Sequence, residues 1–257
     1  MAYKSLFEDV IAYGTSDFDS HSRYVECSLP LETIIGETRN ILFNGFQNVE
    51  DRVRIVLNPP RMIRAVMDHK IETPLADYSL VADSIALGLA IYSRDPRARK
   101  LIDKYEEAVE KESPRLLDEK LKQEADAATW IASHPIKSRF SAGVLAKKAK
   151  EKDILLIALA HGGVAAGMDV FLNYTSLTGS RKSKFYATRL SVNKIGDLNP
   201  RLNAQEKEML AEEAKKREVV IFDEDSCTGN TIAGAQMYFE NLFKKQVITR
   251  VNYWPGH

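Results

Sequence analysis

The stretch from Val219 to Thr231 constrains the fold more than any other part of the chain. Its first four residues, Val219–Phe222, are apolar, as in a strand buried on both faces of a parallel sheet. Two carboxylates, Asp223 and Glu224, follow at the carboxyl end of that strand. Small and hydroxyl-bearing residues come next, and apolar residues at helical spacing begin after Thr231. The stretch therefore predicts a buried strand, a tight polar turn and a helix.

A turn that leads from a strand into a helix N-terminus can bind an anion. Backbone N–H groups converge there and the helix dipole favours negative charge, and the hydroxyls of Thr228 and Thr231 add donors. Asp223 and Glu224 would repel a simple phosphate, so we expect a ligand with hydroxyl groups or a metal beside its phosphate. A ribose 5-phosphate fits, because the acids can hold the ribose hydroxyls while the turn holds the phosphate.

This stretch resembles the signature of type I phosphoribosyltransferases, which bind phosphoribosyl pyrophosphate (PRPP). The shared pattern is four apolar residues, two acids and then Thr-Gly-x-Thr. Glu224 replaces the commoner second aspartate, Asp225 stands where an apolar residue is usual, and Cys227 directly precedes Thr-Gly. In the hypoxanthine-guanine enzymes the last of these positions is an aspartate near the base. The resemblance therefore implies PRPP binding without implying a purine acceptor.

A second loop follows an earlier apolar run. Ile154–Ala160 predicts a buried strand, and His161, Gly162 and Gly163 lead from it into a helix of small residues. Adjacent glycines let a backbone approach an oxyanion closely. The dinucleotide fingerprint is excluded, because it would need glycine in place of His161 or Val164. The loop resembles the pyrophosphate loop of phosphoribosyltransferases, in which a basic residue precedes Gly-Gly.

Between the two loops, Phe185–Leu190 predicts a further strand. The polar segment at residues 191–200 is of the kind that closes over a substrate. In the resembled family a mobile catalytic loop follows this strand. Arg189 and Lys194 are the candidates to counter the charge of a diphosphate, and either is also consistent with an ordinary surface cation.

The C-terminal half alternates strands and helices, which predicts a parallel sheet with right-handed crossovers. A helix at Asn203–Lys216 and a strand at Gln246–Tyr253 complete the pattern. Both loops then lie at carboxyl ends of strands, where open α/β sheets bind ligands. We expect an α/β fold with a parallel-sheet, type I phosphoribosyltransferase-like domain at residues 138–257. Residues 1–137 would form a mostly helical region that supplies the hood over the base.

Helical spacing of apolar residues predicts helices around Leu6–Ile11, at Leu31–Phe46 and across most of residues 61–132. Arg52–Leu57 alternates between apolar and polar residues and is predicted to be a strand that ends at Asn58–Pro60. The helical region either packs onto the next domain or binds protein partners, and its residues do not decide between these two roles.

The resemblance implies a reaction in which the ribose 5-phosphate of Mg²⁺-PRPP passes to a nitrogen acceptor resembling a nucleobase, with release of pyrophosphate. Asp223, Glu224 and Asp225 are the expected catalytic residues, and Asp225 either assists the base or caps the helix. Mg²⁺ is the expected cofactor, bound by Asp223 and Glu224 directly or through water. The expected substrate-binding residues are Ser226, Cys227, Thr228, Gly229, Asn230, Thr231, His161, Gly162, Gly163, Arg189 and Lys194.

The composition of the whole chain limits which classes of partner we expect. Lys plus Arg and Asp plus Glu both total 36 in the 257 residues, so the chain lacks the basic excess of a nucleic-acid binder. Two cysteines far apart fit a reducing, cytoplasmic setting. The apolar runs are too short to cross a bilayer, and the first residues lack a signal-peptide pattern. We expect PRPP and a small-molecule acceptor as partners in nucleotide metabolism, and a homodimer is left open.

Two alternatives remain open. The first is a non-catalytic regulator that keeps the fold and senses PRPP or a nucleotide. The second is a different phosphosugar enzyme, such as a hydrolase or a phosphoribosyl-binding lyase, that uses the same phosphate cradle. Release of pyrophosphate from PRPP in the presence of a base separates the three.

Overall fold

The computed structural model of the chain describes residues 3–12, 28–73, 79–122, 131–160, 162–190, 197–225 and 229–253. It divides into an N-terminal unit, residues 4–127, and a C-terminal unit, residues 128–257 together with residues 1–3. Tyr3 joins the C-terminal unit through two hydrogen bonds. Its hydroxyl donates to Asp169 Oδ1 over 2.7 Å, and its backbone N–H donates to Ser176 Oγ over 3.0 Å.

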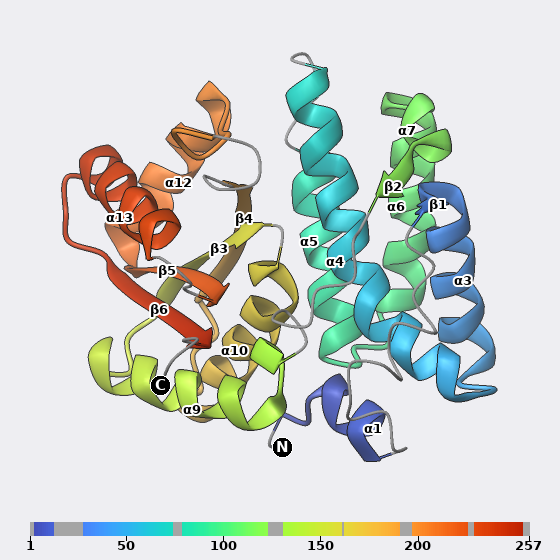
Figure 1. Cartoon of the computed structure of the whole chain (residues 1–257), viewed down its shortest axis with the longest axis horizontal. Coiled ribbons are helices and arrows are strands. Elements are labelled where there is room, and N and C mark those ends of the chain that lie inside the picture. The colour runs from blue at the N-terminus through green and yellow to red at the C-terminus, as the bar shows by residue number, and fades with distance from the viewer. Residues whose placement is uncertain are drawn as a thin grey trace. The chain divides into compact units, whose positions relative to one another are not determined.

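A parallel sheet forms the centre of the C-terminal unit (Figure 1). In the described residues it consists of β3 (Ile154–Ala160), β4 (Lys184–Arg189), β5 (Glu218–Asp225) and β6 (Ile248–Tyr253). The strands lie in the order β4-β3-β5-β6, and all pairs are parallel. Every residue of β3 is buried, as expected for a central strand. The predictions of strands at these four places and of a parallel α/β sheet are confirmed.

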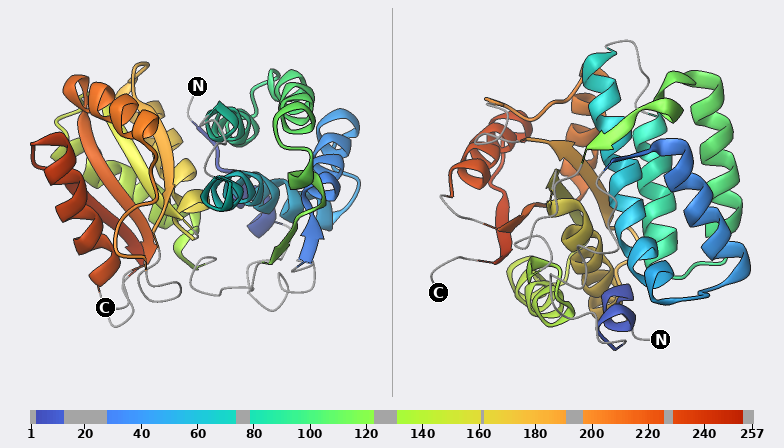
Figure 2. Two further views of the ribbon diagram at one scale, coloured as in Figure 1. Left: turned by 90° about the horizontal axis from the view of Figure 1, so that it is seen from above. Right: turned by 45° about the vertical axis from the view of Figure 1, so that its right-hand side comes forward.

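Helices cover both faces of this sheet (Figure 2). Adjacent residues of β4 show this directly, because side chains alternate between faces along a strand. Phe185 packs against Phe171 of α10 (Gly163–Thr178), with the ring centroids 5.8 Å apart. The next residue, Tyr186, donates a hydrogen bond to Glu206 of α12 (Ala204–Lys216) on the other face. α13 (Asn230–Phe243) also packs against β5.

Gly167 sets the close approach of α10 to the sheet. A Cβ added there would lie 3.0 Å from Ala158 Cβ and 3.2 Å from Phe222 Cδ1. A larger residue would therefore push α10 away from β3 and β5. This spacing fixes the N-terminus of α10 beside the carboxyl ends of both strands.

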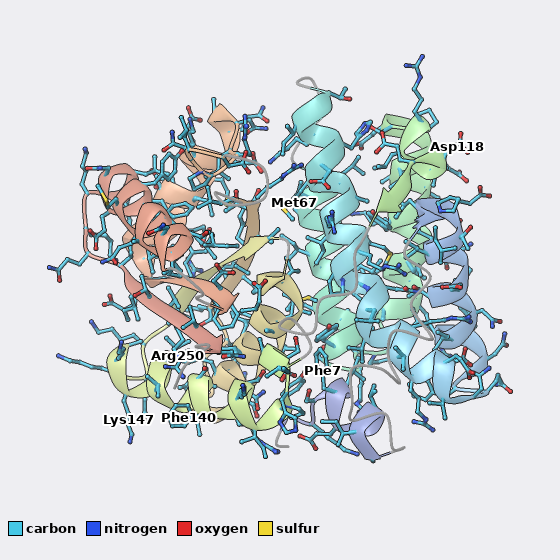
Figure 3. The ribbon with its side chains drawn as sticks, viewed as in Figure 1. Phe7, Met67, Asp118, Phe140, Lys147 and Arg250 are labelled. Carbon is cyan, nitrogen blue, oxygen red and sulfur yellow. The ribbon has the colours of Figure 1, made fainter. Side chains whose placement is uncertain are left out.

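The edge strand β6 is fastened to α9 (Pro135–Lys148) by polar contacts. Arg250 lies over the ring of Phe140, 5.3 Å from its centroid (Figure 3), and donates through Nε to Ser141 Oγ over 2.8 Å. Burial lowers the pKa of Arg250. Asn252 donates to the carbonyl of Ala132 over 2.8 Å, which ties the residues just before α9 to this unit. The division between the units accordingly comes before residue 128, ahead of the boundary predicted at residues 137–138.

The N-terminal unit is mostly helical. Its described elements are α1 (Leu6–Ala12), β1 (Ser28–Pro30), α3 (Leu31–Asn44), α4 (Val49–Glu72), α5 (Ser79–Tyr92), α6 (Ala98–Glu112), α7 (Arg115–Asp118) and β2 (Lys120–Lys122). β1 and β2 form a short antiparallel pair. Phe7 and Tyr92 meet edge to face in the core with ring centroids 6.2 Å apart, and Met67 is also buried.

The prediction of a strand at Arg52–Leu57 is wrong, because these residues belong to α4, which continues through Pro59 and Pro60. A proline inside a helix leaves the carbonyl four residues earlier without its usual donor. For Pro60 that carbonyl belongs to Val56, and the buried hydroxyl of Tyr92 donates to it over 2.7 Å. A side chain of α5 thus replaces the hydrogen bond that the proline removes.

Across the described ranges, no helix combines the length and the apolar character needed to cross a bilayer. The predicted helices at Leu6–Ile11 and Leu31–Phe46 are confirmed, and no end differs by more than two residues. Gly14, the expected stop of the first, lies outside the described residues.

Candidate functional site

Described residues from the two stretches predicted to bind PRPP lie together at one edge of the sheet. β3 and β5 are parallel neighbours, with Ala158 opposite Phe222. Ala160, the last residue of β3, and Glu224 each follow this pair by two residues. The chain leaves β3 towards β4 on one side and returns to β5 on the other, so the strand order reverses between them. Open α/β sheets bind ligands at such a switch point.

Gly162 and Glu224 are in direct contact there. A Cβ built on Gly162 would lie 1.7 Å from Glu224 Oε1, which no real pair of atoms tolerates. Only glycine leaves room for the carboxylate in this position. Residues more than sixty positions apart in the sequence are therefore neighbours, as the two-loop prediction requires.

Gly163, the first residue of α10, lies close to both acids. A Cβ there would be 3.4 Å from Asp223 Oδ1 and 3.4 Å from Glu224 Oε2, which is ordinary van der Waals contact. Gly162 is therefore the sterically stricter of the two glycines. The sequence alone does not rank them, because the ranking depends on where the Glu224 side chain lies.

The orientation of Glu224 follows from strand alternation. Phe222 contacts Gly167 of α10, so Glu224, two residues later, points to the same face and meets the N-terminus of that helix. A carboxylate is favoured there by the helix dipole. Its Oε2 atom is buried. Asp223 Oδ1 accepts a hydrogen bond from the backbone N–H of Glu224 over 3.0 Å, within the last residues of β5.

Two of the helices that begin at this edge, α10 and α13, have glycine at the N-cap. Gly162 precedes α10 and Gly229 precedes α13, so neither cap has a side chain that could accept from the first-turn N–H groups. Gly229 has a φ of 74°, a left-handed conformation that favours glycine. α12, by contrast, begins with a capping box in which Asn203 and Glu206 bond each other's backbone. The first turns of α10 and α13 thus have no side-chain cap.

Arg189 ends β4 at the same edge, opposite Ala160. Its Nε lies 4.0 Å from Oδ2 of Asp197, whose side chain is 1% exposed. Arg201 Nε donates to the other oxygen of Asp197 over 2.9 Å, and the Arg201 backbone N–H donates to the carbonyl of Arg189 over 2.9 Å. The guanidinium of Arg189 therefore lies against a buried carboxylate that it shares with Arg201.

Asp197 is the residue that the sequence reasoning missed. Its only signal is Arg201 four residues later, a spacing that is common in polar segments. The structure shows that this carboxylate pairs with Arg189 at the end of β4 and with Arg201, four residues after Asp197.

Several predicted site residues lie outside the described residues: His161, Lys194, Ser226, Cys227 and Thr228, together with the side chain of Asp225. Asn230 and Thr231 form the first turn of α13, directly after Gly229. The predictions for the undescribed residues remain predictions.

A magnesium ion could be held only in part by the described acids. In those ranges, no group of three or more His, Cys, Asp or Glu residues is placed to hold a metal. Asp223 and Glu224 supply two neighbouring carboxylates. Mg²⁺ is often bound by one or two carboxylates, with the other positions filled by substrate phosphates and water. The donor set fits an ion that arrives with its ligand.

Comparison of the chain with models of known protein families, with curated proteins and with solved structures finds no match. The contact between the two loops and the position of the two acids are therefore the basis for assigning a function.

Proposed function

We propose that the C-terminal unit binds Mg²⁺-PRPP and transfers its phosphoribosyl group to a nitrogen acceptor, with release of pyrophosphate. The observation that supports this is the contact of Gly162 and Gly163 with Asp223 and Glu224 at the switch point between β3 and β5. One loop offers backbone donors and the other offers carboxylates. PRPP carries a diphosphate and two ribose hydroxyls on adjacent parts of one molecule, which matches this pairing.

Each part of the site has a role in this proposal. Asp223 and Glu224 hold the ribose hydroxyls and share the Mg²⁺ ion with the substrate. The backbone N–H groups of Gly162 and Gly163 bind the diphosphate at the N-terminus of α10. Residues 226–231 hold the 5′-phosphate at the start of α13, where Gly229 turns the chain into the helix.

The reaction breaks the bond between ribose C1 and the diphosphate oxygen and forms a bond between C1 and the acceptor nitrogen. The electron pair of the broken bond leaves with the diphosphate, and the acceptor loses its proton. Positive charge develops on the ribose ring, so the protein need not supply a nucleophile. It needs to orient the ribose and stabilise the negative charge of the departing diphosphate. A Mg²⁺ ion held between Asp223, Glu224 and the substrate would offset part of that negative charge.

A PRPP- or nucleotide-sensing role on the same fold is the second candidate. The position of Arg189 beside the buried Asp197 favours it, because the carboxylate that Arg189 shares with Arg201 holds the cation 4.0 Å away and so less available to the leaving diphosphate. The N-terminal unit would then transmit or report the binding event.

Pyrophosphate release from Mg²⁺-PRPP, measured for the full chain with a mixture of nucleobases and other nitrogen acceptors, tests the proposal. A transferase releases pyrophosphate only with a matching acceptor and loses this activity in the Asp223→Asn, Glu224→Gln double variant. Binding of PRPP without release under any acceptor supports the sensor. Absence of PRPP binding at millimolar concentration overturns both.

A further inference from the structure

The outward face of α9 carries two apolar side chains among cations. Ile136 and Phe140 lie one helical turn apart, and each residue is 64% exposed. A helix that only covers a sheet presents polar residues to water, so packing does not account for this pair. We propose that this face binds an acidic amphipathic helix of a protein partner, whose apolar side chains pack on Ile136 and Phe140. This binding surface is independent of the proposed function.

The packing of α9 fixes the direction of this face. The helix packs against α10 and β6, and its buried residues are Pro135, Ser138, Ser141, Ala142, Leu145 and Ala146. On the outward side, Arg250 of β6 lies over the Phe140 ring, 5.3 Å from its centroid (Figure 3). The Phe140 side chain is therefore already held in one position, which reduces the side-chain entropy lost when a partner binds.

Gly143 gives a partner room beside this pair. It lies on the same side of α9, three residues after Phe140, and no atom of the described residues lies within 4 Å of where its Cβ would be. An apolar side chain of the partner can therefore pack between Phe140 and the α9 backbone. From Ile136 to Gly143 the helix rises by roughly 10 Å, about two turns. This length suits apolar side chains spaced one turn apart on a partner helix.

The charges that α9 and β6 carry are all positive: Lys137, Arg139, Lys147, Lys148 and Arg250. The sequence has no aspartate or glutamate from Ala127 to Lys150, although the whole chain has no net charge. α10, which also packs against α9, has Asp169 as its one charged residue, and that side chain is buried. Acidic residues beside the partner's apolar side chains would pair with these cations and fix its orientation.

An anionic lipid surface also attracts cations beside apolar side chains, but the narrow apolar strip on α9 favours a protein. A helix that lies in a membrane surface presents a wide apolar face to the lipid. Among the large apolar residues of α9, Ile136 and Phe140 are exposed, while Leu145 is buried in the unit. Two side chains match the contact area of a single partner helix better than that of a lipid surface.

A displayed library of randomised helical peptides of about 20 residues, selected on the full chain, tests the proposal. We expect enriched peptides to have a net negative charge and apolar residues at positions i and i+4. The tightest of them, measured by fluorescence anisotropy, should bind Ile136→Ser at least about tenfold more weakly than wild type. Met237→Ser is the matched control, because it removes an apolar side chain from α13 that is 66% exposed, and it should bind as wild type does.

The charges are tested with the double variant Arg139→Gln, Lys147→Gln. It should weaken binding of the same peptide about threefold or more at low salt, and the difference from wild type should shrink at high salt because salt screens exposed charges. Circular dichroism verifies that each variant is folded, and Phe140→Ser replaces Ile136→Ser if that variant is not.

Enrichment of no peptide, of neutral or basic peptides, or of acidic peptides that bind Ile136→Ser as tightly as wild type would overturn the proposal. Sedimentation of the wild-type chain with phosphatidylserine-containing vesicles, abolished in Ile136→Ser, would assign the face to a lipid surface instead. A wild-type dimer in analytical ultracentrifugation that dissociates in Ile136→Ser would assign it to a second copy of the chain. Either of these two results also overturns the proposal.

Discussion

The Glu224 carboxylate fills the space that a side chain at Gly162 would need: Glu224 Oε1 lies 1.7 Å from where a Cβ of Gly162 would be. This relationship joins the end of β5 to the start of α10. It makes the absence of a side chain at residue 162 a condition for the placement of an acid more than sixty residues later. The pair therefore offers a direct way to disturb the candidate site without touching the core.

Gly162→Ala should displace the Glu224 side chain while the fold persists. The clashing atom is the end of a flexible side chain, so the free energy of unfolding should change by less than about 1 kcal/mol. Affinity for Mg²⁺-PRPP, measured by calorimetry, should fall about tenfold or more because the carboxylate of Glu224 is displaced. Gly163→Ala is the matched control, since its Cβ would make only ordinary contacts at 3.4 Å, and its effect on affinity should be smaller. A larger loss of affinity in Gly163→Ala would contradict this ranking.

Gly167→Ala and Gly143→Ala should change the free energy of unfolding by different amounts or in opposite directions, although both residues lie inside helices. At Gly143 nothing lies within 4 Å of an added Cβ, so alanine should stabilise the protein by about 0.5–1 kcal/mol through helix propensity. At Gly167 the added Cβ meets Ala158 Cβ at 3.0 Å, and overpacking typically costs about 1–3 kcal/mol. Chemical denaturation of the two variants measures the difference. Equal stabilisation would mean that α10 does not pack on the sheet as closely as described.

Tyr92→Phe should destabilise the N-terminal unit, because it leaves the buried carbonyl of Val56 without the hydroxyl that replaces the missing helical donor of Pro60. A buried acceptor left unsatisfied costs about 1–3 kcal/mol. Pro60→Ala restores a backbone N–H at the right position in α4. The cost of Tyr92→Phe, measured by urea denaturation, should therefore be smaller in the Pro60→Ala background. An identical cost in both backgrounds would show that the Tyr92 hydroxyl does not compensate for the N–H that Pro60 lacks.

The same pair of residues explains why sequence patterns predicted the wrong structure at Arg52–Leu57. Two adjacent prolines normally end a helix, and the alternating residues before them are typical of a strand. The helix nevertheless continues, and Tyr92, more than thirty residues away, donates to the carbonyl that Pro60 leaves without a helical donor. A contact between two helices is not encoded in the local pattern of either one.

The C-terminal unit was more predictable. β3 and the first part of β5 are apolar runs that form buried strands, and parallel strands end at the same edge, so the meeting of the two loops followed from topology. The contact of Gly162 with Glu224 did not follow, because it depends on the register of Ala158 with Phe222. Asp197 was not predicted as a site residue for a similar reason, since its partner Arg189 lies eight residues earlier, at the end of β4.

Acidification should loosen α9 through His134. The Nδ1 atom of His134 accepts a hydrogen bond from the backbone N–H of Ile136 over 3.3 Å, and burial together with Lys137 and Arg139 lowers the pKa of the imidazole below its usual 6.5. The folded state thus favours neutral His134. Its contribution to stability is complete above pH 6.5 and is lost as the pH falls through the lower folded-state pKa.

His134→Asn keeps a side-chain acceptor at the N-cap and cannot titrate in this range. Denaturation curves between pH 7.5 and pH 5 should therefore show a smaller fall in the free energy of unfolding for the variant than for wild type. A parallel fall in both proteins would show that other groups account for the acid sensitivity.

Calorimetric titration of Mg²⁺-PRPP into the folded wild-type chain and into the Asp223→Asn, Glu224→Gln double variant tests the central claim most directly. If the two acids hold the ribose hydroxyls and the bound cation, each substitution removes charge-assisted contacts, and PRPP affinity should fall about tenfold or more per site. Inorganic phosphate should bind the variant as well as or better than wild type, because repulsion is relieved. Equal binding of Mg²⁺-PRPP by both proteins, or binding by neither, would contradict the account.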